Sequence, residues 1–285
     1  MVIPMNNSND WKVKNRIRQQ YERELKSLTN QIFRHIENTK DPKEIIRILS
    51  HISNNKSFQR LCEEKAFKMV TAVNKATYKS WREAALNNTK GKKLYKALRY
   101  QVRNSSLESS IATQIQINAR YIRTLPTNIA FEVTEFINSE ASKGMRASEL
   151  AEYIKSAFPE KSKANASLIA RTEVSKSQTA LTQARAEALD LNWYIWRTSE
   201  DSRVRSSHDF MEGVLVRWND PPNPELLDPD FKGKKTYGKY HAGNIFNCRC
   251  YPEPVIDIDD VEFPCRVYFN GKIQNMTRNE FLEIA

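Results

Sequence analysis

Glycine and proline are concentrated in the last third of the chain. Five of the seven glycines lie between Gly213 and Gly271, and seven of the eleven prolines lie between Pro221 and Pro264. Because both residue types interrupt helices, long intervals without them favour long helices, and dense clusters favour strands and turns. The sequence therefore predicts a mainly α fold. A long-helix N-terminal part, reaching about residue 190, is expected to precede a small α+β C-terminal module.

Apolar residues recur at helical spacing in the first part. The clearest stripe repeats every three or four residues, and its members are Val13, Ile17, Tyr21, Leu25, Leu28, Ile32 and Ile36. Weaker stripes predict helices around 67–81 and 94–102. Ser105 and Glu108 form a capping-box pattern before another helix, which Pro126 is expected to end. A short helix should precede Pro159, and a long one should cover 164–189.

The period changes after residue 190. Aromatic and β-branched residues at 192–197 and 213–218 predict strands, and 264–269 followed by Asn270-Gly271 predicts a hairpin. A loop is expected at 221–240, and a short helix after Thr277 as its N-cap. The chain is accordingly divided into a basic helical region (1–104), the helical part of a module (105–190) and a small α+β part with Cys-x-Cys (191–285).

The net positive charge of the chain belongs entirely to its first third. Residues 1–100 hold 22 Lys and Arg against 9 Asp and Glu, whereas residues 101–285 hold 23 against 25. Such a stretch attracts a polyanion or an acidic protein surface; the alternative is an ordinary solvated helical surface. The residues expected to contact nucleic acid are Lys12, Lys14, Arg16, Arg18, Lys90, Lys92 and Lys93.

The sequence argues against membrane and secreted proteins. No apolar run approaches the ~18–20 residues of a membrane span, and Met1–Arg16 lacks the apolar stretch of a secretory signal. The four cysteines are therefore expected to be reduced thiols or metal ligands. Cys62 and Cys265 are expected to be structural.

The remaining two cysteines lie near two histidines. His208, His241, Cys248 and Cys250 fall within one stretch rich in turns, and two imidazoles with two thiolates can complete a tetrahedral zinc site. Residues two apart on an extended segment face the same side, so both thiols of Cys-x-Cys can face one ion. The alternative is that both cysteines are reduced core residues and His241 lies in a loop.

A second polar cluster precedes His208. Asp201, Arg203 and Arg205 can contact nucleic acid, take part in catalysis or form an internal salt-bridge network. The network is the favoured interpretation. Arg171 and Glu173 are expected to join it, with Glu173 facing Arg203 or Arg205, and Arg171 facing Asp201 or Asp209.

Several strings resemble a known family. They are ARTEVSKSQTALTQARAEAL, then WYIWRTSEDSRVRSSHDFMEG, then the CRC of Cys248-Arg249-Cys250. Over about residues 105–256 they resemble the Mu F-like phage head morphogenesis family of minor head proteins. The resemblance implies a minor capsid protein of a tailed bacteriophage, located in the virion near the portal vertex after assembly in the host cytoplasm. Its implied partners are the portal protein, head shell proteins and packaged DNA.

Two other functions remain open. One is a metal-dependent nuclease or nucleotide-dependent transferase that uses His208, Arg203, Arg205 and Asn247. The other is a plain DNA-binding protein without a head partner. The sequence contains no Gly-rich phosphate loop, Ser/His/Asp string or paired-carboxylate motif, which favours binding without turnover.

Overall fold

The computed structural model describes residues 11–88, 91–101, 105–141, 143–233 and 235–285, without the side chains of 93, 99–101 and 105. Contacts divide the chain into two units. The helical unit comprises residues 15–71 and 113–173, and the sheet unit comprises the described residues of 1–14, 72–112 and 174–285. Neither unit is one continuous stretch, so the ranges 1–104, 105–190 and 191–285 remain a prediction of successive segments.

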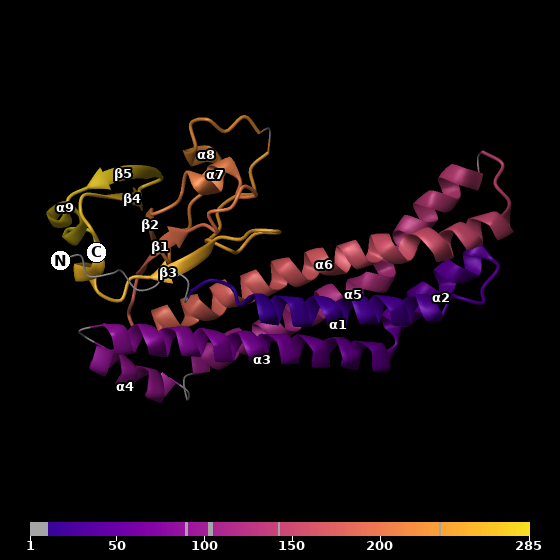
Figure 1. The fold of residues 1–285 in the computed structure, drawn as a ribbon, viewed down its shortest axis with the longest axis horizontal. Coiled ribbons are helices and arrows are strands. Elements are labelled where there is room, and N and C mark those ends of the chain that lie inside the picture. The colour runs from indigo at the N-terminus through magenta and orange to yellow at the C-terminus, as the bar shows by residue number, and fades with distance from the viewer. Residues whose placement is uncertain (1–10, 89–90, 102–104, 142, 234) are drawn as a thin grey trace. The chain divides into compact units, whose positions relative to one another are not determined.

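Six helices precede the first strand among the described residues (Figure 1). Their bounds are α1 Asn15–Arg34, α2 Pro42–Asn54, α3 Lys56–Asn87, α4 Gly91–Gln101, α5 Ser105–Ala141 and α6 Ala147–Glu187. The long-helix N-terminal part is therefore confirmed. The helix α2, which was not predicted, begins with Pro42 after Asp41, whose side chain accepts a hydrogen bond from the Lys43 N–H.

The helical unit is a bundle with an apolar interior. The stripe predicted for the first helix is buried at Tyr21, Leu25, Leu28 and Ile32. Polar contacts tie neighbouring helices together around that interior: Ser167 on α6 donates to Glu22 on α1 at 2.9 Å. Similar contacts join α3 to α1 through Lys68 and Glu24, and α5 to α3 through Arg123 and Glu63.

The expected helix ends at Pro126 and Pro159 were wrong. Pro126 lies inside α5 and Pro159 inside α6. An internal proline removes one hydrogen bond and costs about 3 kcal/mol, but burial on both sides can offset this cost. Leu125 and Ile129, which flank Pro126, are 1% and 3% exposed. Gly144, by contrast, adopts a positive φ of 88° between α5 and α6.

The sheet unit contains a five-stranded sheet with the order β3-β1-β2-β4-β5. The strands are β1 Trp193–Arg197, β2 Leu215–Arg217, β3 Tyr251–Pro254, β4 Cys265–Phe269 and β5 Lys272–Met276. The strand β1 is antiparallel to β2 and β3, β2 is parallel to β4, and β4–β5 is a hairpin. Asn270 and Gly271 turn that hairpin with φ values of 50° and 78°. The predicted strands and hairpin are thus confirmed.

The strand β3 was not predicted. It contains Pro252 and Pro254, which pair in register with Trp196 and Tyr194. Proline is tolerated in an edge strand, because its missing N–H need not serve an inner ladder, and β3 is an edge of this sheet. The helix α8, Pro224–Leu227, likewise interrupts the loop expected at 221–240.

The two faces of the sheet contribute to separate cores. Tyr194 and Trp196 pack with Trp81 of α3 and Ala186 of α6 in one buried cluster. Trp193 and Ile195, which alternate with them along β1, pack on the other face with Phe281. That residue belongs to α9 (Arg278–Leu282), which Thr277 caps as predicted, in a capping box with Glu280.

The predicted fold class, a helical N-terminal part followed by a small α+β module, is therefore confirmed. Among the described residues, no helix combines the length and apolarity that a membrane crossing requires.

Candidate metal centre

Three buried side chains meet beside the first face of the sheet. His208 lies on the short helix α7 (Ser206–Asp209), and Cys248 and Cys250 directly precede β3. Nδ1 of His208 lies 3.4 Å from Sγ of each cysteine. The ligand atoms all lie within 4.8 Å of one another, and the residues are 2%, 6% and 1% exposed. This group could hold a metal ion.

The other ring nitrogen of His208 faces a chain of hydrogen bonds. Nε2 lies 2.9 Å from the Tyr240 hydroxyl, which donates to Oε1 of Glu225 at 2.6 Å. Since Tyr240 gives its hydrogen to the carboxylate, its oxygen accepts from Nε2–H. That tautomer leaves the lone pair of Nδ1 directed toward the thiols. Metal-binding histidines commonly donate their second N–H in this way.

The two thiols have different proton affinities. A hydrogen bond from the Cys250 thiol holds the pKa of Cys248 well below its usual value. Burial is the main cause that raises the pKa of Cys250, and the adjacent Cys248 raises it further. A divalent cation would bind both sulfurs as thiolates, and two thiolates with a neutral imidazole would balance its charge. The donor set therefore fits a buried zinc ion.

His241 lies apart from this group. Its Nδ1 is 3.1 Å from the Tyr194 hydroxyl, and its ring packs 5.3 Å from that of Trp218. Burial lowers the pKa of His241 to about 4, so the ring is neutral at pH 7. The structure thus brings together three of the four predicted ligands, and the described residues provide no fourth His, Cys, Asp or Glu ligand.

The helix α6 supports the segment that carries the cysteines. Thr179 donates to the carbonyl of Ala242 at 2.7 Å. At the next residue, Gly243, a Cβ atom would lie 2.6 Å from Thr179 Oγ1 and 2.8 Å from the carbonyl oxygen of Cys250. Gly243 also has a φ of +82°. Glycine therefore permits both the turn and the close approach to α6.

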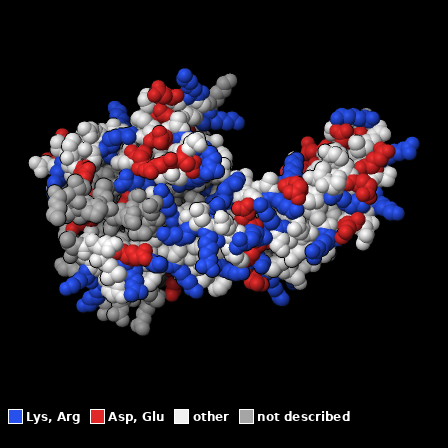
Figure 2. All heavy atoms as spheres, viewed as in Figure 1, with Lys and Arg blue, Asp and Glu red and all other residues white. Residues whose placement is uncertain are grey.

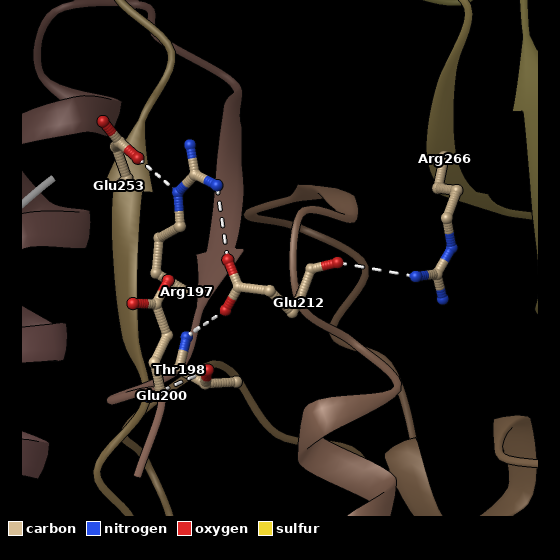
Figure 3. A network of polar contacts seen from close by, with 6 residues as sticks. All are labelled: Arg197, Thr198, Glu200, Glu212, Glu253 and Arg266. Carbon is tan, nitrogen blue, oxygen red and sulfur yellow. Dashed lines mark hydrogen bonds and ion pairs between the residues drawn. The ribbon is translucent and has the colours of Figure 1, made fainter. Parts of the chain in front are cut away.

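A second network anchors the loop that carries His208 (Figure 3). Arg197 on β1 donates to Glu253 on β3 at 2.5 Å and to Glu212 at 3.3 Å. Glu212 also accepts from the Thr198 N–H at 2.6 Å, and its carbonyl accepts from Arg266 on β4 at 3.5 Å. Despite the nearby guanidinium of Arg197, burial raises the pKa of Glu253. This network was not predicted from the sequence, because Glu253 lies on the unpredicted β3.

The predicted salt-bridge network is present in part. Asp201 pairs with Arg249 and, at 3.4 Å, with Arg203. A backbone hydrogen bond from Arg203, together with Arg249, lowers the pKa of Asp201 to about 2. The Arg249 side chain therefore faces Asp201. Arg205 instead contacts Phe246, and donates to its carbonyl at 3.1 Å.

Arg171 and Glu173 belong to the helical unit, and Asp201, Arg203 and Arg205 to the sheet unit. Glu173 is 1% exposed, and its charge adds to the effect of burial in raising the pKa of Tyr21. The expected pairing of Arg171 and Glu173 with the loop residues stays a prediction.

The basic residues predicted to contact nucleic acid are divided between the units. Lys12, Lys14 and Lys92 belong to the sheet unit, and Arg16 and Arg18 to the helical unit. Lys12 Nζ lies 5.9 Å from the centroid of the Tyr251 ring, and Arg18 lies 3.7 Å from Glu22. Lys90 and the side chain of Lys93 lie outside the described residues.

Comparison with known proteins finds a relative of part of this chain. An uncharacterized protein of Haemophilus influenzae strain Rd is 32% identical over 140 residues, which are 49% of this chain and 28% of the relative. The chain thus matches little more than a quarter of that relative's length. No solved structure matches this chain.

The family comparison covers the centre itself. Residues 132–252 match the model described as Phage Mu protein F like protein. The matched stretch includes α6, β1, β2 and all three side chains of the metal group. Residues 132–252 of this chain are therefore similar to the Mu F-like phage family, as the resemblance in the sequence implies.

Proposed function

We propose that the chain is a minor capsid protein of a tailed phage that acts by binding, without turnover. The observation that carries this proposal is the family match over 132–252, which covers both the helix α6 and the metal group. In the proposed assembly, the protein associates with the portal and head shell and assists head assembly and DNA packaging or delivery. The sheet unit provides a body that a metal makes rigid.

Co-purification tests the portal association. The full chain is co-expressed with the portal protein of the same phage, and the complex is isolated through a tag on the portal. We expect Cys265→Ser, at a half-buried cysteine outside the metal group, to be retained like the unchanged chain. Cys248→Ser should be retained less because its docking body loosens. Failure of the unchanged chain to co-purify would contradict the portal proposal.

We propose that the metal is zinc, with about one ion per chain. His208, Cys248 and Cys250 are the protein ligands that the geometry supports, and His241 is the candidate that the sequence adds. Cobalt substitution distinguishes the ligand sets, since visible absorption reports coordination geometry. Loss of the tetrahedral spectrum in His208→Gln but not in His241→Gln would establish the three-residue set. Loss in both would restore the four-residue set.

We also propose that the basic segment 1–100 binds packaged DNA through phosphates, without sequence preference. Truncation is a poor test, because residues 15–71 and 72–100 belong to different units. Charge removal at Lys12, Lys14, Arg16 and Arg18 avoids that problem. Affinity for duplex DNA should fall, with a shallower dependence on salt. Removing Lys161 and Lys163 from α6 is the control; an equal loss there would contradict the assignment.

The geometry around His208 disfavours the nuclease alternative. The residue is 2% exposed, and its two ring nitrogens face the thiols and Tyr240. A general base must reach the proton that it removes. The buried His208 ring cannot reach a nucleic acid bound at the surface. Cleavage of plasmid DNA with Mg²⁺ or Mn²⁺ that disappears in His208→Ala would reverse this conclusion.

A further inference from the structure

The guanidinium of Arg205 is held between two aromatic rings. Its Cζ lies 4.9 Å from the ring centroid of Phe246 and 5.6 Å from that of Tyr237. The two rings lie 5.1 Å apart with an interplanar angle of 78°, and Nη2 of Arg205 donates to the Phe246 carbonyl at 3.1 Å. These contacts fix the plane of the guanidinium. We call these three residues the Arg205 clamp.

Arg205 differs from the arginines around it. Arg197 pairs with Glu253 and Glu212, and Arg203 and Arg249 pair with Asp201. By contrast, no carboxylate of the described residues forms an ion pair with Arg205. Within the described part of the chain, one of its five N–H groups donates to an acceptor, the Phe246 carbonyl. The clamp therefore presents an oriented cation with donors available for an anion.

Both rings of the clamp remain accessible. Tyr237 is 49% exposed and Phe246 is 43% exposed, although the sheet unit has a large apolar core nearby. Large aromatic side chains usually contribute to such a core. Exposed rings beside an oriented arginine are instead typical of a binding surface for planar groups.

Further positive charge flanks the clamp. Lys232 and Lys235 are exposed on the loop that carries Tyr237, and the side chain of Arg203 is 71% exposed. Figure 2 shows basic side chains, with acidic ones among them, at the edge of the sheet unit where this loop projects. Lys239 pairs with Asp220 at 3.1 Å. The surface around the rings thus complements a chain of negative charges.

We propose that the Arg205 clamp is a binding site for single-stranded nucleic acid. A base would stack on the exposed ring of Tyr237 or on that of Phe246, since the two rings are nearly perpendicular, and the N–H groups of Arg205 would bind an adjacent phosphate. Single strands are required because a duplex hides the faces of its bases. This site is separate from the proposed duplex contacts of residues 1–100, since it uses stacking as well as charge.

Fluorescence anisotropy with labelled dT20 and rU20 tests the site, with a duplex of equal length for comparison. Tyr237→Leu keeps an apolar side chain but removes stacking, and should weaken single-strand binding about tenfold or more. Arg205→Gln should weaken it and reduce its salt dependence. Phe131→Leu and Lys161→Gln are the controls, since both side chains are exposed on the helical unit, and they should bind like the unchanged chain.

Metal content and melting temperature are measured for each variant. These measurements exclude a loss of binding that is caused by unfolding. Tyr237 is substituted in preference to Phe246, because Phe246 lies only two residues before Cys248. The site is supported if either single strand binds the unchanged chain and if Tyr237→Leu loses that binding. The strand that binds more tightly shows whether the ligand is single-stranded DNA or RNA. Absence of binding to both strands would overturn it. Unchanged affinity in Tyr237→Leu and Arg205→Gln would also overturn it, and would leave the clamp as a contact that only attaches the loop to α7.

Discussion

The hydroxyl oxygen of Tyr240 lies 2.9 Å from Nε2 of His208, on the opposite side of the ring from the two thiols. Glu225 accepts the Tyr240 hydrogen at 2.6 Å, and all three residues are buried. A buried carboxylate therefore acts through a phenol to orient a ring that could bind a metal. Such supporting residues control metal affinity although they do not touch the ion.

Tyr240→Phe should weaken zinc binding about 10- to 100-fold without abolishing it. The substitution leaves Nε2–H of His208 and the carboxylate of Glu225 without their buried partner. Competition with a chelator of known affinity measures the effect. Tyr237→Phe is a matched control, because that ring is exposed, and it should retain the unchanged affinity. Equal affinities for Tyr240→Phe and the unchanged chain would show that the tyrosine does not support the ligand.

Removal of the metal should destabilise the sheet unit selectively. The five tryptophans, at 11, 81, 193, 196 and 218, all lie in that unit, so their fluorescence reports its unfolding. A chelator, or Cys248→Ser, should lower the melting temperature seen by fluorescence, whereas Cys265→Ser in the metal-bound protein should change it little. If elemental analysis finds no zinc, or Cys248→Ser melts like the unchanged chain, the metal centre does not exist.

The cysteines of the metal group were readable from sequence because they are neighbours along the chain, whereas His208 lies 40 residues before Cys248. Cys248 and Cys250 are separated by one residue, and a single short helix presents His208 to them. The position of His241 depends instead on Tyr194 and Trp218, which lie on or beside strands far away in sequence. Residue types and spacing alone could not show which partner that ring would take.

Packing also explains why some elements differ from their prediction from sequence. Local propensity favours a helix end at Pro126, but Leu125 and Ile129 are buried in the helical unit. Pro252 and Pro254 argue against a strand, yet pairing with β1 places them at an edge where prolines are tolerated. The Arg197–Glu253 ion pair follows from that pairing. Neither tertiary effect leaves a local signal.

Glu212 should contribute measurably to the stability of the sheet unit. Its carboxylate accepts from the Thr198 N–H and from Arg197. Glu212→Ala leaves a buried N–H without an acceptor, since Thr198 is 1% exposed, and should lower the free energy of unfolding by about 2–3 kcal/mol. Glu212→Gln retains an acceptor and should lose about 1 kcal/mol. Urea denaturation followed by tryptophan fluorescence measures both, and Glu262→Ala, at an exposed position, should be neutral. An unchanged free energy of unfolding in Glu212→Ala would show that the Glu212 carboxylate does not stabilise the sheet unit.

The pKa of His241 makes the sheet unit sensitive to acid. Burial lowers this pKa from 6.5 to about 4, so the unfolded chain binds a proton more readily than the folded chain. Stability should therefore fall as the pH decreases below about 6.5, and this loss should be complete near pH 4. By pH 5 the free energy of unfolding should have fallen by about 2 kcal/mol because of this residue. A chelator is present throughout, so that metal release does not contribute.

His241→Gln isolates this contribution, because glutamine can still hydrogen-bond to Tyr194 but does not titrate. Its free energy of unfolding should depend less on pH between 7 and 5 than that of the unchanged chain. His35→Gln, at an exposed histidine of the helical unit, should keep the original dependence. Parallel pH curves for His241→Gln and the unchanged chain would mean that His241 keeps an ordinary pKa. The ring would then be more open to water, or to a metal ion, than its packing against Tyr194 and Trp218 indicates.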